Sequence, residues 1–126
     1  MQAADEIYAP DFVAHWLGDD TVGRDKFKAL IGDGRRRAPD LKETIEQIVA
    51  EGDLVVTRFT SRGTFAGEPG EKSKFKEVTM NEMAIHRIHD GKIVEQWTVG
   101  GAPIVRYLDD NSEGAKNRAA AESAAR

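Results

Sequence analysis

The stretch IHRIHDGKIVEQW, residues 85–97, decides the fold because it consists of two β-rich runs joined by a tight turn. Asp90-Gly91 at its centre is a strong β-hairpin signal. The flanking runs, 78–88 and 93–99, therefore predict two long antiparallel strands. A third run, LVVTRFT at 54–60, is rich in β-branched and aromatic residues and is bounded by glycines. The second half of the chain thus predicts an antiparallel meander of at least three strands.

The hairpin register determines which side chains share a face of this sheet. A three-residue loop over 89–91 is predicted, so that Ile88 pairs with Lys92 and Glu82 lies opposite Thr98. A two-residue turn would change this pairing. One predicted face carries Glu82, Ala84, His86, Val94, Gln96 and Thr98. The opposite face carries Met83, Ile85, Ile93, Glu95, Trp97 and Val99.

Both faces mix apolar and polar residues, which indicates that both are covered. Helices from the first half of the chain can cover one face. A second copy of the chain is the economical cover for the other, because a chain of this length has too few helices for both. A homodimer is therefore expected through the face with Met83, Ile85, Trp97 and Val99.

The first half of the chain is predicted to be mainly helical. Residues 3–8 read as the end of a helix that Pro10 blocks, and residues 11–17 read as a short strand or turn facing the interior. A second helix is predicted from Arg24, with Thr21 as its N-cap. Apolar periodicity alone also favours a helix over Leu41–Val49. Helices followed by a meander indicate an α+β fold, with the helices on one face of a curved sheet.

Length and composition limit the domain count and the function classes. The chain has 126 residues, a net charge of −4 and no cysteine, which fits one domain without disulfides or thiolate metal sites. That domain is expected over 1–108, with 109–126 as an alanine-rich tail that is flexible or a frayed helix. The mild acidity argues against nucleic acid or an anionic membrane as partner. Without a long apolar run or a leader, a soluble cytoplasmic protein is expected.

The predicted pocket face supplies the candidate catalytic group, Glu82. Partial burial under helices would raise the pKa of Glu82 and suit it to general acid–base catalysis; alternatively it pairs with Arg58 or Lys92 near the sheet edge. His15 is the second catalytic candidate if it points into the pocket mouth, or else a hydrogen-bonded core residue. No metal-ligand spacing or phosphate loop is present, so no cofactor or metal is expected. The predicted substrate-binding residues are Trp16, Phe27, Arg58, Ala84, His86, Gln96 and Thr98.

Several stretches resemble the SnoaL-like polyketide cyclase family. They are DFVAH at 11–15, the Pro39-Asp40-Leu41 step, AEGDLVVTRFTSRGTFAG at 50–67 and the hairpin at 85–97. The resemblance implies a nuclear-transport-factor-2-like α+β cone, in which a bent sheet wraps helices around an apolar pocket. It also implies that 41–49 is a strand. Family members close polyketide rings by cofactor-free aldol chemistry, while other proteins with the fold are isomerases, dehydratases, epoxide hydrolases or binding modules.

The sequence departs from the family pattern at the end of the hairpin. The family ends it with Glu-His-Trp-Asp, whereas Gln96 and Thr98 replace the histidine and the catalytic aspartate here. Glu82, opposite Thr98 in the predicted register, could bring a carboxylate to nearly the same volume. The expected function is a cofactor-free enzyme acting on a small apolar carbonyl compound; the alternative is a non-catalytic binding protein. The family also begins with a full helix, for which only 1–9 remain, so a shortened start or a more open pocket is expected.

Overall fold

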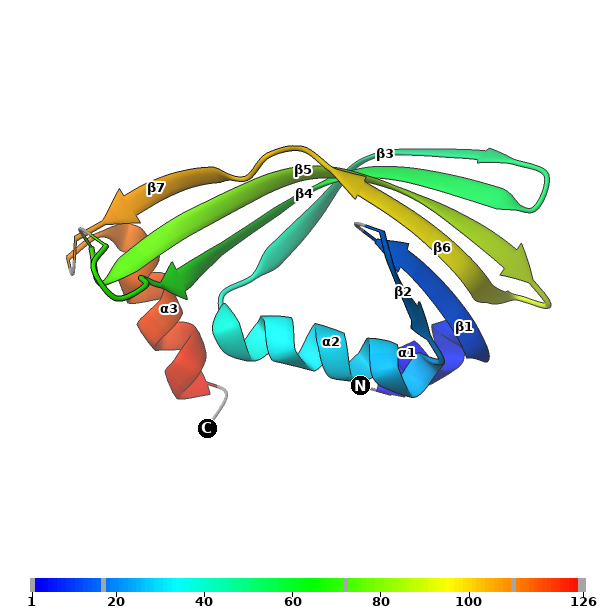
Figure 1. Ribbon diagram of the computed structural model, residues 1–126, viewed down its shortest axis with the longest axis horizontal. Helices are drawn as coiled ribbons and strands as arrows, with labels where there is room; N and C mark the ends of the chain where they lie inside the picture. The colour runs from blue at the N-terminus through cyan, green and yellow to red at the C-terminus, as the bar shows by residue number, and fades with distance from the viewer. Residues whose placement is uncertain (1, 17, 72, 110, 125–126) are drawn as a thin grey trace.

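The computed structural model describes residues 2–16, 18–71, 73–109 and 111–124. Its backbone forms one strongly curved, open sheet with helices beneath it (Figure 1). The helices are α1 (Gln2–Ile7), α2 (Arg24–Arg37) and α3 (Glu113–Ala124). The strands are β1 (Tyr8–Trp16), β2 (Asp19–Val22), β3 (Lys42–Glu51), β4 (Leu54–Ala66), β5 (Phe75–His89), β6 (Lys92–Gly100) and β7 (Ile104–Leu108). The α+β fold class predicted from the sequence is confirmed.

The strand order is β2-β1-β6-β5-β4-β3, and β7 pairs with the start of β5. The β1–β6 pair is parallel, and the other pairs are antiparallel. The meander β3-β4-β5-β6 follows chain order, as short connections favour. β1 therefore enters at the free side of β6, which brings the beginning of the chain next to the hairpin that ends the meander.

An aromatic cluster fastens α2 to the sheet. Phe12 of β1 is fully buried, and its ring centroid lies 4.8 Å from that of Phe27 in α2 and 4.7 Å from that of Tyr8. Figure 1 shows α2 running beneath the arch of the sheet. We call the sheet face that carries Phe12 the concave face and the opposite one the convex face.

The start of α2 differs from the sequence prediction. The N-cap position is Gly23 at φ 97°, and no side chain caps the helix there. Thr21 instead lies in β2, opposite Ala14 of β1, so its predicted capping role is wrong. The Gly23 N–H donates to the carbonyl of Phe12 at 2.7 Å, which ties the beginning of the helix directly to the core strand.

Residues 42–51 form strand β3 and not the helix that apolar periodicity favours. A register shift in the β3–β4 pair between Ile45 and Gln47 explains the misleading spacing. Ile45 pairs with Phe59 and Ile48 with Thr57, so two residues three apart face the same side of the sheet. The bulge thus gives an edge strand the spacing of a helix, while the family resemblance predicted it correctly.

The β5–β6 hairpin has a two-residue turn, so the predicted three-residue loop is wrong. Asp90 and Gly91 both have positive φ, 51° and 75°, and His89 pairs with Lys92. A register shift follows at Ile88, beyond which Glu82 lies opposite Gly100 instead of Thr98. The turn and the shift together move the pairing by two residues, and a shift of two returns each side chain to its predicted face. Ile93, opposite Ile88, is the exception and joins the face of His86.

The polar tail contains helix α3, which packs at the far end of the sheet. Gly114 and Ala115 are buried there, and a Cβ added to Gly114 would lie 2.6 Å from a methyl group of Leu108. Residues 113–124 of the tail are therefore helical, while the flexibility of the tail stays a prediction. Among the described helices, none is long and apolar enough to cross a membrane.

Candidate functional site

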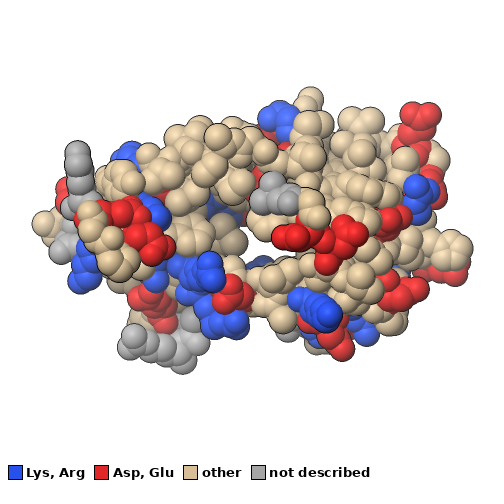
Figure 2. Space-filling view, in the orientation of Figure 1, with Lys and Arg blue, Asp and Glu red and all other residues tan. Residues whose placement is uncertain are grey.

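The concave face opens onto a cleft between the sheet and α2. Figure 2 shows the surface hollowed between these two layers. β5 and β6 present to this cleft most of the predicted pocket residues, and the pairing of β4 with β5 adds Thr57 and Ser61 to the same face. The predicted pocket residues that share it are Glu82, Ala84, His86, Gln96 and Thr98.

Glu82 is the half-buried acid of the cleft. Burial raises the pKa of its carboxyl group, the negative charge of Glu43 raises it further, and a hydrogen bond from Ser61 opposes both. The Ser61 hydroxyl lies 3.0 Å from Glu82 Oε1. A carboxyl group with a raised pKa can give and take a proton closer to neutral pH, which suits general acid–base catalysis.

The alternative in which Glu82 pairs with Arg58 or Lys92 is wrong. Arg58 of β4 lies on the convex face, opposite Met83 of β5. Its Nε donates to Gln47 Oε1 at 2.8 Å. Lys92 Nζ donates to two backbone carbonyls of α1 at 2.9 and 3.1 Å. The structure therefore does not bring Arg58 to the substrate-binding face on which it was predicted.

A second polar group lies further along the concave face. His86 Nε2 is 3.1 Å from the Thr57 hydroxyl, and Gln96 Nε2 donates to Thr98 Oγ1 at 3.1 Å. Burial lowers the pKa of His86, and the facing Gln96 side chain offsets part of this shift. Among the described residues, His86 Nδ1 and Gln96 Oε1 are buried without a hydrogen-bond partner. The lowered pKa favours the neutral imidazole, whose ring lies between the Thr57 hydroxyl and the Gln96 side chain.

Ala84 separates these two polar groups along β5. It is 1% exposed and lies between Thr57 on β4 and Thr98 on β6. Trp16, next to Thr98 on β1, is 46% exposed on the same face, while Phe27 belongs to the aromatic cluster under β1. The contribution of these three residues to ligand binding stays a prediction.

His15 lies on the convex face, so the structure does not bring it together with Glu82. β1 turns Phe12 to the concave side, and strand alternation then points His15 the other way, beside Trp97 of β6. Its Nδ1 is 2.6 Å from Asp20 Oδ1 and its Nε2 is 2.7 Å from Glu95 Oε2. The ring also stacks on Trp97 at 5.4 Å. The predicted direction into the pocket mouth is wrong, and the hydrogen-bonded alternative fits the structure.

His15 is expected to make the stability of the protein depend on pH. Hydrogen bonds to Glu95 and Asp20 raise the pKa of His15 above its ordinary value of 6.5. A raised pKa in the folded state contributes stability that is complete below the unfolded value and is lost as pH rises through the folded value. The melting temperature should therefore fall as pH rises from the ordinary histidine pKa of 6.5 through the raised folded-state pKa, and His15→Gln should remove part of that fall. The measurement is thermal unfolding by circular dichroism across this range.

The matched control for this prediction is His89→Gln. His89 lies at the hairpin tip with its side chain 74% exposed. Its replacement removes one imidazole but leaves the contacts of His15 with Asp20 and Glu95 in place. In His89→Gln, the melting temperature should change with pH as it does in the wild-type protein. Equal slopes for the wild-type protein and His15→Gln would contradict the assignment.

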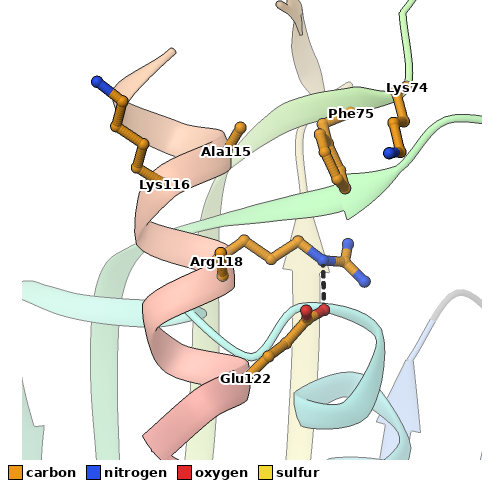
Figure 3. A pocket seen from close by; sticks show the side chains of 7 residues that line it. Lys74, Phe75, Ala115, Lys116, Arg118 and Glu122 are labelled. Carbon is orange, nitrogen blue, oxygen red and sulfur yellow. Dashed lines mark hydrogen bonds and ion pairs between the residues drawn. The ribbon is translucent and has the colours of Figure 1, made fainter. Parts of the chain in front are cut away.

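A separate hollow of about 290 Å³ lies between α3 and the start of β5. Figure 3 shows Arg118 reaching across it to Glu122, which accepts its Nε–H at 2.8 Å. The Arg118 guanidinium also lies 5.5 Å from the centre of the Phe75 ring and donates to the carbonyl of Thr64. The polar groups of Arg118 and Glu122 are thus paired within the protein. The hollow is explained by the packing of α3 against the sheet. Within the described ranges no three His, Asp or Glu side chains are grouped to hold a metal ion.

Sequence reasoning missed three residues of the cleft: Thr57, Ser61 and Glu43. Thr57 and Ser61 alternate with Phe59 along β4, so the period-two pattern of that strand contained the signal. Glu43 lies opposite Ser61 on a strand that periodicity had assigned to a helix. Its position could be inferred only once that strand was recognised.

Comparison with solved structures gives the same fold. Wild-type IdmH, a proposed polyketide cyclase from Streptomyces antibioticus, is 28% identical, with a TM-score of 0.62 over 97% of this chain and 86% of that one. A loop-truncated IdmH variant is 32% identical, with a TM-score of 0.59 over 79% and 78% of the two chains. AclR, a proposed hydroxylase from Streptomyces galilaeus, is 29% identical, with a TM-score of 0.61 over 75% and 71%.

The family comparison covers most of the sequence. No curated protein matches the chain. The family model described as SnoaL-like polyketide cyclase matches residues 1–101, which include α1, α2 and every strand that borders the cleft. With the curved sheet, the concave cleft and the IdmH likeness, this match shows that the chain belongs to the SnoaL-like polyketide cyclase family.

Proposed function

We propose that the protein is a cofactor-independent enzyme in which Glu82 is the general acid–base. Its substrate class is a small apolar carbonyl compound, and the reaction is an aldol-type cyclisation or a related isomerase or lyase step. The observation that carries the proposal is the half-buried Glu82 carboxyl on the concave face, with its pKa raised by burial. Removal of a proton next to a carbonyl group needs a base of this kind near neutral pH.

The polar groups further along the face can stabilise the charge that develops on the carbonyl oxygen. In the tautomer in which the Thr57 hydroxyl donates to His86 Nε2, Nδ1 carries the proton, and a shift of the neighbouring Gln96 side chain would let this N–H donate to a ligand. His86 is four residues from Glu82 on β5, roughly 13 Å at the rise of an extended strand. A substrate long enough to span Ala84 could reach both groups, and the Thr98 hydroxyl lies between them on β6.

A non-catalytic binding protein is the second candidate. The observation that favours it is that Gln96 and Thr98 occupy the hairpin positions where the family pattern has a histidine and an aspartate. A threonine hydroxyl cannot act as a base near neutral pH. The concave cleft would then hold an apolar ligand without converting it.

The Glu82→Gln variant separates these candidates. With a panel of polyketide, steroid and epoxide substrates, the variant should lose about 10²- to 10⁴-fold in kcat while still binding the substrate. Glu51→Gln is the matched control, because it removes a carboxylate at the exposed far end of β3. Full turnover by Glu82→Gln would contradict the role of Glu82. Ligand binding by the wild-type protein without turnover of any compound would favour the binding protein.

We also propose a homodimer through the convex face, which carries Met83, Ile85, Trp97 and Val99. Met83, Ile85 and Val99 are 48%, 38% and 66% exposed. Large apolar side chains that are exposed side by side on a sheet favour a protein partner. A second copy can supply the same surface in return, as two-fold dimers do.

A further inference from the structure

Three side chains form a row across the concave face at the rim of the cleft. Glu43 on β3 pairs with Ser61 on β4, while Glu82 on β5 lies opposite Phe59, two residues away from Ser61. The Ser61 hydroxyl oxygen is 3.0 Å from Glu82 Oε1 and 3.4 Å from Glu43 Oε1. One hydroxyl group therefore lies within hydrogen-bond distance of two carboxyl groups.

The chemistry of a hydroxyl group decides how both contacts can be satisfied. A serine hydroxyl has one hydrogen to donate and lone pairs that can accept. When both carboxylates are ionised, Ser61 can donate to only one of them, and the other approaches its lone pairs. With one proton on Glu82, the Glu82 O–H can donate to Ser61 while the Ser61 O–H donates to Glu43. With one shared proton, both carboxyl groups are therefore hydrogen-bonded to Ser61. With none, one carboxylate faces a lone pair of the Ser61 oxygen.

The two ends of the row differ in their access to water. Glu82 is half-buried, whereas Glu43 is exposed on β3, the edge strand of the sheet. Burial raises the pKa of Tyr8, and the charge of Glu43 raises it further. Glu46, the other nearby carboxylate of β3, accepts a hydrogen bond from Thr60 instead. Glu43 is therefore the acid that connects this row to solvent.

We propose that Ser61 and Glu43 are further functional residues of the site and form a proton relay with Glu82. This inference rests on the proposed role of Glu82. When Glu82 takes a proton from a substrate carbon, the Glu82 O–H passes its proton to the Ser61 oxygen as Ser61 gives its own to the Glu43 carboxylate. Glu43 then releases that proton to water. The net change is one proton moved from substrate to solvent, with all three side chains returned to their starting forms.

The first test is an NMR titration of the glutamate carboxyl groups in the ligand-free protein. In Glu43→Gln, the midpoint of the Glu82 titration should move to lower pH, because the neighbouring negative charge is gone. Glu51→Gln removes a charge from the same strand and should leave the Glu82 titration unchanged. An unchanged Glu82 midpoint in Glu43→Gln would overturn the relay.

The second test separates proton transfer from simple electrostatics. Ser61→Ala should lower kcat by at least about tenfold with little change in KM, and Ser61→Thr, which keeps a hydroxyl group, should restore it. Glu43→Gln should lower kcat similarly and regain activity in acetate buffer, a small acid that can replace the lost carboxyl. Normal kcat in both Ser61→Ala and Glu43→Gln would overturn the relay. The titration needs no substrate, so an active Glu82→Gln enzyme would defeat the proposed function while leaving the coupling measurable.

Discussion

Replacing Phe12 by alanine should lower the free energy of unfolding by about 3–5 kcal/mol. The ring is fully buried and contacts Tyr8 and Phe27, with the three ring centroids 4.7 to 5.0 Å apart. Its removal leaves a cavity where α2 meets β1. Because β1 is fixed by its neighbouring strands and α2 is held by this cluster, the cavity cannot easily close. Single domains are stable by about 5–15 kcal/mol, so the loss is a large part of the total.

Urea unfolding followed by circular dichroism measures this effect. Val22→Ala is the control, because that valine is 59% exposed and its truncation should change stability by less than about 0.5 kcal/mol. A Phe12→Ala loss of less than about 1 kcal/mol would show that the cluster does not anchor α2. Since the cluster supports one wall of the cleft, the variant should also bind ligand more weakly at temperatures where it remains folded.

The meander could be predicted from the sequence because its signals are local. Asp90-Gly91 allows the positive φ angles of a tight turn, and β-branched runs on both sides favour strands. The structure of residues 42–51 could not be predicted from periodicity, because a bulge between Ile45 and Gln47 imitates helical spacing. The resemblance to a family supplied what the local pattern could not.

The site was predictable to the extent that it depends on strand alternation. Glu82 and His86 were placed on one face correctly even though the loop length was wrong, since a shift by two residues preserves the face. His15 could not be placed in this way, because β1 has apolar residues on both sides and its parallel pairing with β6 joins distant segments. The contact between Glu43 and Ser61 depends on the same kind of long-range pairing.

The proposed dimer predicts the second large effect, on the convex face. Val49, Val56, Ile85 and Trp97 follow one another across four strands, and Met83 and Val99 form the next row. Trp97 is held between the His15 ring, 5.4 Å away, and the Arg87 guanidinium, 5.7 Å away. A large aromatic side chain that is already fixed in place loses little entropy on binding and is typical of the centre of an interface.

Val99→Lys should therefore convert a dimer to a monomer, with the dissociation constant raised by at least about 100-fold. Val99 is 66% exposed in a single chain, so the lysine costs the monomer little. In a two-fold dimer the substitution occurs twice, and each ammonium group would be buried without a partner. Leu30→Lys, at a leucine of α2 that is 55% exposed on the concave side of the sheet, is the control and should remain a dimer. Light scattering at micromolar concentration should give twice the 13.9 kDa chain mass for the wild-type protein. A wild-type monomer would contradict the dimer, and a dimeric Val99→Lys would place the interface elsewhere.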